Sequence, residues 1–513
     1  MYSLNNGFQP IKINTGIERM AIIAKNDFQE VKDLSRYYII VKNKNSTEFI
    51  CSEIVLVDDF PTGHIGLSNK AFQALLLDSE QPSKVSWEMH YRETPDSYRF
   101  IKKRMTEQNF CYSKEQMDLI VNDIVAGRLS KVEETAFVLS QQFQDFSMDE
   151  IEYFTNAIAY SGETIDFGEV VYDKHSLGGV PGNKVTLLIV PIVASSGLLI
   201  PKTSSRAITS PSGTADTMES LGCEVAFSSS EIVEMSKKTR GLIVWGGALN
   251  LAPADNILIK DVEYPLGIDP KSMFMASIMA KKKALGVDFC VLDIPTGKGA
   301  KVTSVQDARQ LARLFGELGQ RLDIQVECGI TFASLPVGHA VGPALEAREA
   351  LSALINPKEA STSLIEKSTS LAGMILEQAG KATRGQGQNM AKELLYSGKA
   401  YNKMRQIMEV QNGNPDLKPE DVQVGEYTCE YRAVASGWPS DINNSVVNQI
   451  AKAAGAPRDK GAGIQFVIKK ESVRAGDVIF RVHTNSAERL TKVESLLQKL
   501  NPITIEGMLL ERV

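Results

Sequence analysis

The sequence predicts a multidomain α/β protein, and three observations support this prediction. The chain has 513 residues, its first 95 residues are rich in short strand-like runs, and strand-like and helix-like segments alternate from about residue 166. A chain of this length needs more than one hydrophobic core, because single domains usually hold roughly 100–200 residues. Alternating strands and helices are typical of a mostly parallel sheet that carries helices on both faces.

Four domains and one linker are expected along the chain. Near the N-terminus, apolar runs such as Tyr37–Val41 alternate with polar turns, which indicates short strands and a small β barrel, a candidate oligomerisation module. The linker is placed at Gln411–Glu420, where turn-forming residues are densest. The expected parts are the β domain (1–95), a helical domain (96–165 with about 254–284), an α/β domain (166–253 with 285–410), the linker (411–424) and a C-terminal α+β domain (425–513).

Two capping boxes predict where helices begin in the helical domain. Ser113 is followed three residues later by Gln116, and Ser147 by Glu150. In such a box each side chain bonds a backbone N–H at the start of the helix. Apolar residues at helical spacing follow both pairs, so we expect two amphipathic helices that pack against other elements and carry no chemistry.

The α/β domain is expected to place its chemistry where parallel strands end. The apolar run Val185–Ala194 is interpreted as a helix kinked at Pro191, since an anion site at a loop-to-helix junction needs free N–H groups. The runs predicted as strands are Glu224–Phe227, Gly241–Trp245, Asp288–Asp293 and Ile324–Cys328.

Composition excludes several classes of protein. A net charge of −6 argues against a nucleic-acid surface, which needs a basic patch. The N-terminus lacks the pattern of a signal peptide, and no apolar run approaches the roughly 20 residues that span a bilayer, so a cytoplasmic protein is expected. The six cysteines are scattered singly and form no zinc pattern, so we expect reduced thiols, no metal and no cofactor.

The stretch Tyr172–Thr186 predicts an anion-binding loop. It follows the apolar pair Val170–Val171 and combines glycines, which let backbone N–H groups approach a ligand, with cations and hydroxyl groups. A flexible glycine turn with solvated lysines is the alternative interpretation of this stretch alone. The residues expected to matter are Lys174, His175, Ser176, Gly178, Gly179, Lys184 and Thr186.

A second polar cluster follows nearby and favours the anion-binding interpretation. Between two apolar segments the chain places hydroxyl groups, one arginine and a Ser-Gly-Thr turn. Hydroxyl and guanidinium donors are suited to phosphate oxygens. The candidate residues here are Ser204, Ser205, Arg206, Thr209, Ser210, Gly213 and Thr214.

The two clusters together resemble the thymidine/pyrimidine nucleoside phosphorylase family. Its members read Asp-Lys-His-Ser-x-Gly-Gly-Val, as at Asp173–Val180, and then Ser-x-Arg, a glycine turn, Thr-x-Asp and Glu, as at Ser204–Glu219. The resemblance covers roughly residues 100–513. The Ser-Pro-Ser-Gly-Thr turn, the extra proline in the first loop and the ninety preceding residues resemble the long type 2 branch, which includes archaeal AMP phosphorylases.

The resemblance implies a site for inorganic phosphate on the α/β domain and a site for the base on the helical domain. It implies that Asp269, at the head of a helix, is a candidate proton donor beside His175. Phosphate is a co-substrate in this reaction, and no cofactor is implied. The residues implied to face the base are Lys260, Ser277, Lys281 and Lys301.

The substrate stays open between two classes. The general family resemblance favours phosphorolysis of thymidine or a related pyrimidine nucleoside. The family contacts the pyrimidine with an arginine where this chain has Lys260 and with an aromatic where it has Lys301. An extra cation would suit a nucleotide such as AMP, which is the alternative, and a homodimer or higher homo-oligomer is expected in either case.

Three rival functions remain. A phosphoribosyltransferase of the anthranilate type would need carboxylates for Mg²⁺, for which Asp216 and Glu219 are the available candidates. A P-loop NTPase is disfavoured, because the glycine stretch lacks the adjacent Gly-Lys-Ser/Thr that holds phosphates and magnesium. A nucleotide sensor without catalysis is the third.

Overall fold

The structure is a computed structural model that describes residues 2–14, 20–28, 37–78, 80–91, 94–207, 210–468 and 472–507. It falls into two compact units, which are described separately: residues 1–106 with 126–133, and residues 107–125 with 134–513. None of the helices in these described ranges is long and apolar enough to cross a membrane. The finer division into four domains and a linker stays a prediction.

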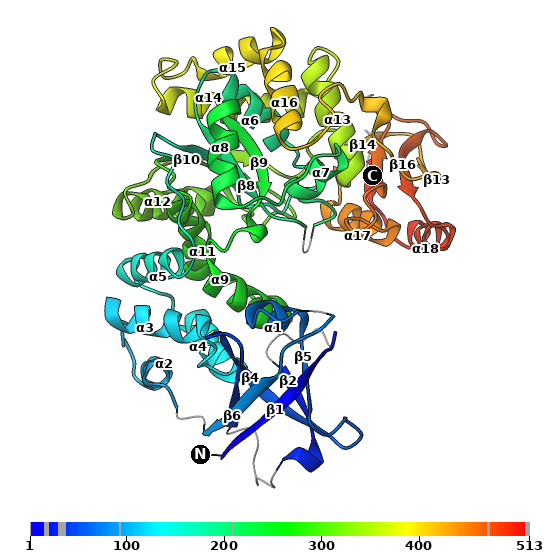
Figure 1. Ribbon diagram of the computed structural model, residues 1–513. Helices are drawn as coiled ribbons and strands as arrows, with labels where there is room; N and C mark the ends of the chain where they lie inside the picture. The colour runs from blue at the N-terminus through cyan, green and yellow to red at the C-terminus, as the bar shows by residue number, and fades with distance from the viewer. Residues whose placement is uncertain are drawn as a thin grey trace. The chain divides into compact units, whose positions relative to one another are not determined.

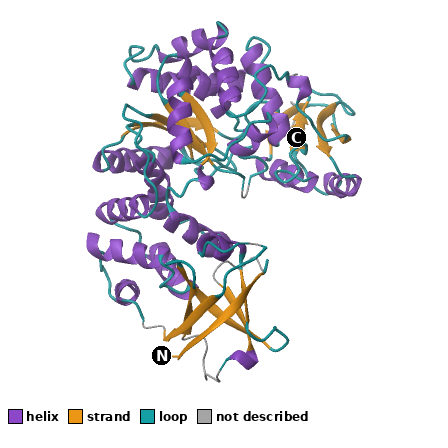
Figure 2. Cartoon of the chain, in the orientation of Figure 1, coloured by secondary structure: helices purple, strands orange, loops and turns teal. Residues whose placement is uncertain are grey.

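The first unit contains the expected β barrel (Figures 1 and 2). Six strands close in the order β1-β5-β2-β4-β3-β6, so the barrel leaves no open sheet edge. Alternate residues point inward, as Ile39, Val41 and Trp87 do in the barrel core. Its elements are β1 (Tyr2–Lys12), β2 (Met20–Ala24), β3 (Tyr37–Asn43), β4 (Phe49–Val57), β5 (His64–Leu67), α1 (Asn69–Ala74), β6 (Val85–Tyr91) and α2 (Asp96–Thr106).

Helices that pack on one another begin where the capping boxes predict. Gln116 and Ser113 bond each other's backbone N–H at the start of α3, and Glu150 and Ser147 do so at α5. In the second unit α5 packs against α3 and α11. The helices are α3 (Lys114–Val125), α4 (Lys131–Phe143), α5 (Met148–Tyr160), α9 (Pro253–Leu258), the π-helical turn η4 (Ile259–Glu263), α10 (Tyr264–Leu266) and α11 (Lys271–Ala284).

The α/β part of the second unit contains parallel strands in two sheets. One sheet has the order β11-β10-β7, the other pairs β8 with β9, and a parallel bridge between Val171 and Leu199 links the segments just before β7 and β8. Their carboxyl ends therefore lie along one edge. The strands are β7 (Tyr172–Ser176), β8 (Ile200–Ser204), β9 (Gly241–Trp245), β10 (Phe289–Thr296) and β11 (Gln325–Phe332).

Helices cover both faces of this strand layer (Figure 1). Helix α14 packs on β7, β10 and β11, and α12 packs on β10 and β11. The run after the first glycine loop is a single helix, as expected, with Pro191 inside it and buried residues from Thr186 to Ala194. The helices are α6 (Thr186–Ser195), α7 (Thr214–Ser220), α8 (Ser229–Thr239), α12 (Val305–Arg321), α13 (Pro343–Ile355), α14 (Thr362–Gln378), α15 (Gly387–Tyr396) and α16 (Lys399–Val410).

One predicted strand is wrong. Glu224–Phe227 forms no strand, although the Val225 carbonyl accepts a hydrogen bond from the Trp245 N–H. The predicted strands Gly241–Trp245, Asp288–Asp293 and Ile324–Cys328 are confirmed as β9, β10 and β11 with small shifts of their ends.

The C-terminal region has its own α+β core. An antiparallel sheet runs in the order β12-β15-β16-β13, and apolar residues such as Val447, Ile464 and Phe480 join it to α17 and α18. Its elements are β12 (Ala340–Val341), β13 (Tyr427–Arg432), β14 (Trp438–Ile442), α17 (Asn444–Ala454), β15 (Gly463–Phe466), β16 (Val478–Thr484), α18 (Ala487–Leu497) and β17 (Ile503–Glu506).

Candidate active site

The first polar cluster is divided between a strand and a loop. Lys174, His175 and Ser176 belong to β7, whereas the sequence places them in the loop that follows a strand. The loop proper contains Gly178 and Gly179, whose φ angles of +75° and +85° favour glycine. Gly179 and Val180 have no protein acceptor for their N–H groups in the described chain, and α6 begins at Thr186, so these N–H groups are available to an anion.

Asp293 contacts several polar side chains on the face of β7 that meets α14. Its carboxylate accepts a hydrogen bond from Ser176 Oγ at 2.7 Å and one from Thr331 Oγ1 at 2.6 Å. The same carboxylate lies 3.1 Å from Lys367 Nζ and 3.9 Å from Lys174 Nζ. Burial would raise the pKa of Asp293, but the two lysines outweigh burial and hold that pKa below its usual value. Two predicted phosphate-binding residues, Lys174 and Ser176, are therefore oriented by one carboxylate.

Asp173 likewise pairs with two lysines, on the opposite face of β7, toward α11. Its carboxylate lies 3.4 Å from Lys202 Nζ and forms an ion pair with Lys282. Burial, opposed by Asp173, lowers the pKa of Lys202 to about 7, and burial lowers the pKa of Lys174 to about 8. Burial and the surrounding lysines also lower the pKa of His175 well below its usual value. His175 is therefore neutral at pH 7 and can offer an N–H, whereas the sequence interpretation makes it a proton donor near neutral pH.

These buried groups contain more cations than anions. Each of the six side chains has at most 8% of its surface exposed. Charges in a protein interior are costly unless they are paired. The excess of lysines over aspartates favours an anionic ligand near β7. The four lysines are Lys174, Lys202, Lys282 and Lys367, and the two aspartates are Asp173 and Asp293.

The second polar cluster is the loop between β8 and α7. Asp216 Oδ2 accepts hydrogen bonds from the N–H groups of Ala207 at 2.8 Å and Gly213 at 3.0 Å. Burial raises the pKa of Asp216, and these two N–H groups oppose that effect. Gly213 is required here, because a Cβ would lie 2.6 Å from Ala207 N. One carboxylate therefore closes the loop on itself.

The predicted hydroxyl groups of this loop differ in their surroundings. Ser204 Oγ donates to the Val244 carbonyl at 3.0 Å, and Ser210 Oγ donates to the Ser212 carbonyl at 2.9 Å. Ser205 is exposed, and Thr214 is the half-buried first residue of α7. Thr209 lies outside the described residues.

Arg206 is turned toward other partners. Its guanidinium lies 2.6 Å from Glu219 and 4.1 Å from the centre of the Trp245 ring. Glu219 also pairs with Lys460 at 2.6 Å. These three charged side chains line a surface pocket of about 390 Å³ beside Cys223. In this conformation Arg206 is committed to stacking and to an ion pair.

The predicted base-binding residues Ser277 and Lys281 meet at Asp255. Ser277 Oγ donates to Asp255 Oδ2 at 2.8 Å, and Lys281 Nζ lies 2.8 Å from the same atom. Ser277 and Lys281 are one helical turn apart on α11, so their side chains share a face. The sequence interpretation gives Asp255 no role.

Lys301 connects the base side to the first glycine loop. Its backbone N lies 3.5 Å from the position that a Cβ on Gly179 would occupy. Its ammonium forms an ion pair with Asp269 and lies 5.7 Å from the centre of the Phe274 ring. The side chain of Asp269, the candidate proton donor, is 44% exposed.

Glu263, a half-buried carboxyl on η4, lies close to these residues. Burial, then repulsion from Asp255 and Asp269, raises the pKa of Glu263 to about 8, so this carboxyl is mostly protonated at neutral pH. Single π-helical turns are frequent at functional sites. Lys260, the remaining predicted base contact, occupies an exposed position of the same turn.

Sequence reasoning missed several of the charged residues that surround the candidate site. Asp293 carried a signal, since a carboxylate ended a run that was otherwise apolar and predicted to be a buried strand. Lys367 carried none, because a lysine on an amphipathic helix is ordinarily solvated. The residues without an assigned role are Lys202, Asp255, Glu263, Lys282, Asp293 and Lys367.

Comparisons with known proteins identify relatives of this chain. Residues 168–401 match the glycosyl transferase family, a/b domain. The chain is 50% identical to the AMP phosphorylase of Thermococcus kodakarensis over 422 residues, which is 82% of this chain and 83% of that protein. It is 45% identical to the AMP phosphorylase of Thermococcus sibiricus over 477 residues, which is 92% of this chain and 93% of that protein.

A solved structure shares the fold. The anthranilate phosphoribosyltransferase of Thermus thermophilus superposes with a TM-score of 0.51 and 18% identity, covering 61% of this chain and 99% of that one. The relatives and the matched domain together show a transferase that acts on a nucleoside or nucleotide. The chain is an enzyme of the pentosyltransferase type and belongs to the thymidine/pyrimidine nucleoside phosphorylase family, in the type 2 branch that includes AMP phosphorylases.

Proposed function

We propose that this enzyme catalyses the phosphorolysis of AMP. The C1′–N9 bond of the nucleotide breaks, a phosphate oxygen bonds to C1′, and the products are adenine and ribose 1,5-bisphosphate. The proton that the attacking phosphate gives up is balanced by the proton that N9 of adenine receives. The transition state resembles an oxocarbenium ion, with negative charge developing on the base.

One observation carries the choice of substrate. The relatives that match most of the chain at 43–50% identity are named AMP phosphorylases. The sequence motifs alone favour thymidine as the substrate. The names of these relatives favour the alternative, the nucleotide AMP. Lys301, whose backbone lies beside Gly179 and whose side chain is half-exposed, supports the same choice, because a nucleotide brings a phosphate of its own.

In this proposal the inorganic phosphate binds beside the buried cations. Lys174 would contact it from β7, and Ser176 would do so by turning its hydroxyl from Asp293 to the phosphate. The free N–H groups of the first loop would complete the site. Thr214 would contact it from the second loop, and Ser204 would do so once its hydroxyl leaves the Val244 carbonyl. Asp269 remains our candidate proton donor, and its pairing with Lys301 would have to loosen when the nucleotide binds.

The test is a substrate panel with and without phosphate. We expect the purified enzyme to release base from AMP only when phosphate is present, with ribose 1,5-bisphosphate detected by ³¹P NMR. CMP, GMP, thymidine and uridine complete the panel. Faster turnover of thymidine than of any nucleotide would reject AMP as the substrate, and base release without phosphate would indicate a hydrolase.

The partners of Asp216 and Glu219 disfavour the phosphoribosyltransferase alternative, which needs these two carboxylates for Mg²⁺. Asp216 closes the second loop, and Glu219 pairs with Arg206 and Lys460, so neither is directed to a Mg²⁺–diphosphate ligand. Insensitivity of the reaction to EDTA would separate the two functions. A homodimer or higher homo-oligomer stays a prediction that sedimentation analysis would check.

A further inference from the structure

Lys184 lies behind the first glycine loop, where the sequence predicts a cation that faces the anion. Its side chain is fully buried. Its ammonium donates to the carbonyl oxygens of Gly182 at 2.8 Å and Val337 at 2.6 Å, and lies 2.9 Å from Glu349 Oε2. An ammonium has three N–H donors, and three acceptors surround it here. Lys184 therefore has no donor left for a phosphate.

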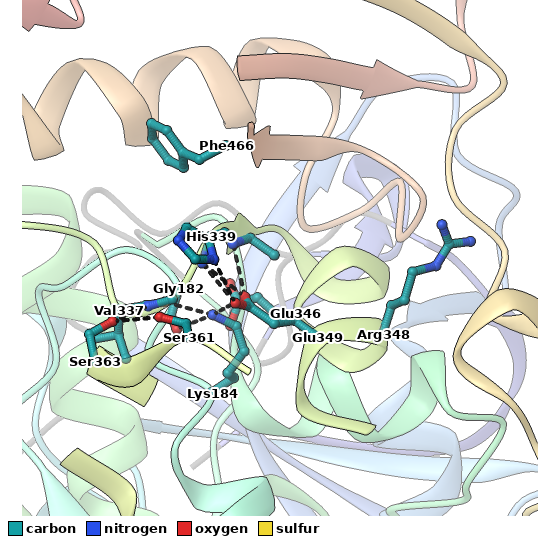
Figure 3. A network of polar contacts seen from close by, with 12 residues as sticks. Gly182, Lys184, Val337, His339, Glu346, Arg348, Glu349, Ser361, Ser363 and Phe466 are labelled. Atoms are coloured by element: carbon teal, nitrogen blue, oxygen red, sulfur yellow. Dashed lines mark hydrogen bonds and ion pairs between the residues drawn. The ribbon is translucent and has the colours of Figure 1, made fainter. Parts of the chain in front are cut away.

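Glu349, on α13, connects Lys184 to the backbone of the segment 337–340. Its carboxylate accepts hydrogen bonds from the N–H groups of His339 at 2.8 Å and Ala340 at 2.9 Å, as Figure 3 shows for His339. The Val337 N–H also donates to the Pro181 carbonyl at 3.1 Å. The segment 337–340 is thus bound at several points to the back of the glycine loop.

There is no spare room at this contact. A Cβ on Gly182 would lie 2.6 Å from the Ala340 carbonyl oxygen, and one on Gly338 would lie 2.8 Å from Lys184 Nζ. Both glycines have positive φ, +71° and +73°. The packing therefore permits one loop conformation, and the buried charge pair sits at its centre.

The buried ammonium also sets the direction of the loop's peptide groups. A trans peptide points its C=O and the following N–H in opposite directions. Because the Gly182 carbonyl is drawn inward to Lys184, the Asn183 N–H is directed away from Lys184. N–H groups that face outward are what an anion-binding loop requires.

We propose that Lys184 and Glu349 are positioning residues that hold the first glycine loop in its phosphate-binding conformation without touching the phosphate. The claim rests on the proposed function, because it assumes that this loop binds phosphate. The segment they hold also pairs with the C-terminal sheet, since the Phe466 N–H donates to the His339 carbonyl at 2.7 Å. The positioning contact thereby joins the loop to a second layer of structure.

The test compares two variants of the contact with a control from the same helix. Glu349→Gln removes the charge and keeps an oxygen acceptor, and Lys184→Met removes the ammonium. Arg348→Met is the matched control, because Arg348 adjoins Glu349 on α13 but points away from Lys184 and donates to the Val422 carbonyl (Figure 3). Phosphate affinity is measured by calorimetry on the full-length enzyme, together with the KM for phosphate, the KM for AMP and the melting temperature.

We expect Glu349→Gln to weaken phosphate binding about fivefold and Lys184→Met about twentyfold or more, with the KM for AMP changed by less than about twofold. The control should lower the melting temperature and leave phosphate affinity within about twofold of wild type. If Lys184→Met does not fold, Glu349→Gln decides the question.

Two results would overturn the inference. Wild-type affinity for phosphate in Glu349→Gln and in any folded Lys184→Met would leave the pair a stabilising contact only. An equal rise in both KM values would mean that the whole site is disturbed rather than the glycine loop. Failure of the wild-type enzyme to bind phosphate is distinguishable from both, because it would reject the proposed function and, with it, this inference.

Discussion

The two glycine loops at the ends of β7 and β8 are held from behind by opposite charges. The first loop closes around the ammonium of Lys184, which draws in the carbonyls of Gly182 and Val337. The second closes around the carboxylate of Asp216, which takes up the N–H groups of Ala207 and Gly213. Adjacent parallel strands thus end in loops of opposite internal polarity.

This difference indicates how each loop would contact an anion. When carbonyls are drawn inward, neighbouring N–H groups are left for a ligand, as in the first loop. When N–H groups are used inside, side-chain hydroxyls must serve as donors, and the second loop is rich in them. We therefore expect the first loop to bind phosphate by backbone N–H groups beside Lys174, and the second by Ser204 and Thr214.

Replacing Lys174 should have the largest effect. Lys174→Met removes the buried cation of β7 and leaves Asp293 with one lysine fewer. We expect kcat/KM for phosphate to fall roughly 100- to 1,000-fold, because charged donors in a buried site stabilise anionic groups strongly. Steady-state kinetics measures it, and a loss below about tenfold would mean that phosphate lies elsewhere.

Adding one methyl group should break the first loop specifically. Gly182→Ala places a Cβ 2.6 Å from a carbonyl oxygen at a φ of +71°, so we expect the free energy of unfolding to fall by about 3 kcal/mol. Gly222→Ala is the control, since its φ is +78° but nothing lies within 4 Å of its Cβ. The control should lose only about 1 kcal/mol in urea denaturation. Equal losses would contradict the tight contact.

Neutralising Asp216 should loosen the second loop without breaking it. Asp216→Asn keeps an oxygen that can accept the two N–H groups but loses the charge, so we expect the KM for phosphate to rise about five- to tenfold. Asp307→Asn, at the exposed start of α12, should leave that KM unchanged. An unchanged KM in Asp216→Asn would show that the charge inside this loop is dispensable.

The pH dependence should be a modest effect and should belong to the first loop. Burial lowers the pKa of Lys174 to about 8, so its cation predominates below pH 8 and is lost as the pH rises through 8. The charged fraction of Lys174 falls about tenfold from pH 7 to pH 9, so we expect phosphate affinity to fall by up to about tenfold over this range, after correction for the ionisation of phosphate itself. In Lys174→Arg the decrease should be absent, because arginine stays charged. A persistent decrease would assign the titration to Lys202, whose pKa is about 7.

The sequence by itself determined the local elements and the order of the motifs. Capping boxes at Ser113 and Ser147 located helix starts, because their hydrogen bonds join residues three apart. The alternation of strands and helices predicted the parallel layer, and two glycine-rich clusters after successive strands predicted where polar residues gather. Each of these features depends on residues that are close together in the sequence.

Only the tertiary structure decided what the charged residues do. Lys174 and Lys184 look alike in sequence, yet one faces Asp293 and the other is enclosed by Val337 and Glu349. Burial also makes His175 neutral, and helix α14 brings a lysine to Asp293 from a distant part of the chain. Desolvation and pairing depend on partners distant in sequence, so local spacing cannot distinguish a cation that awaits a ligand from one that holds the backbone.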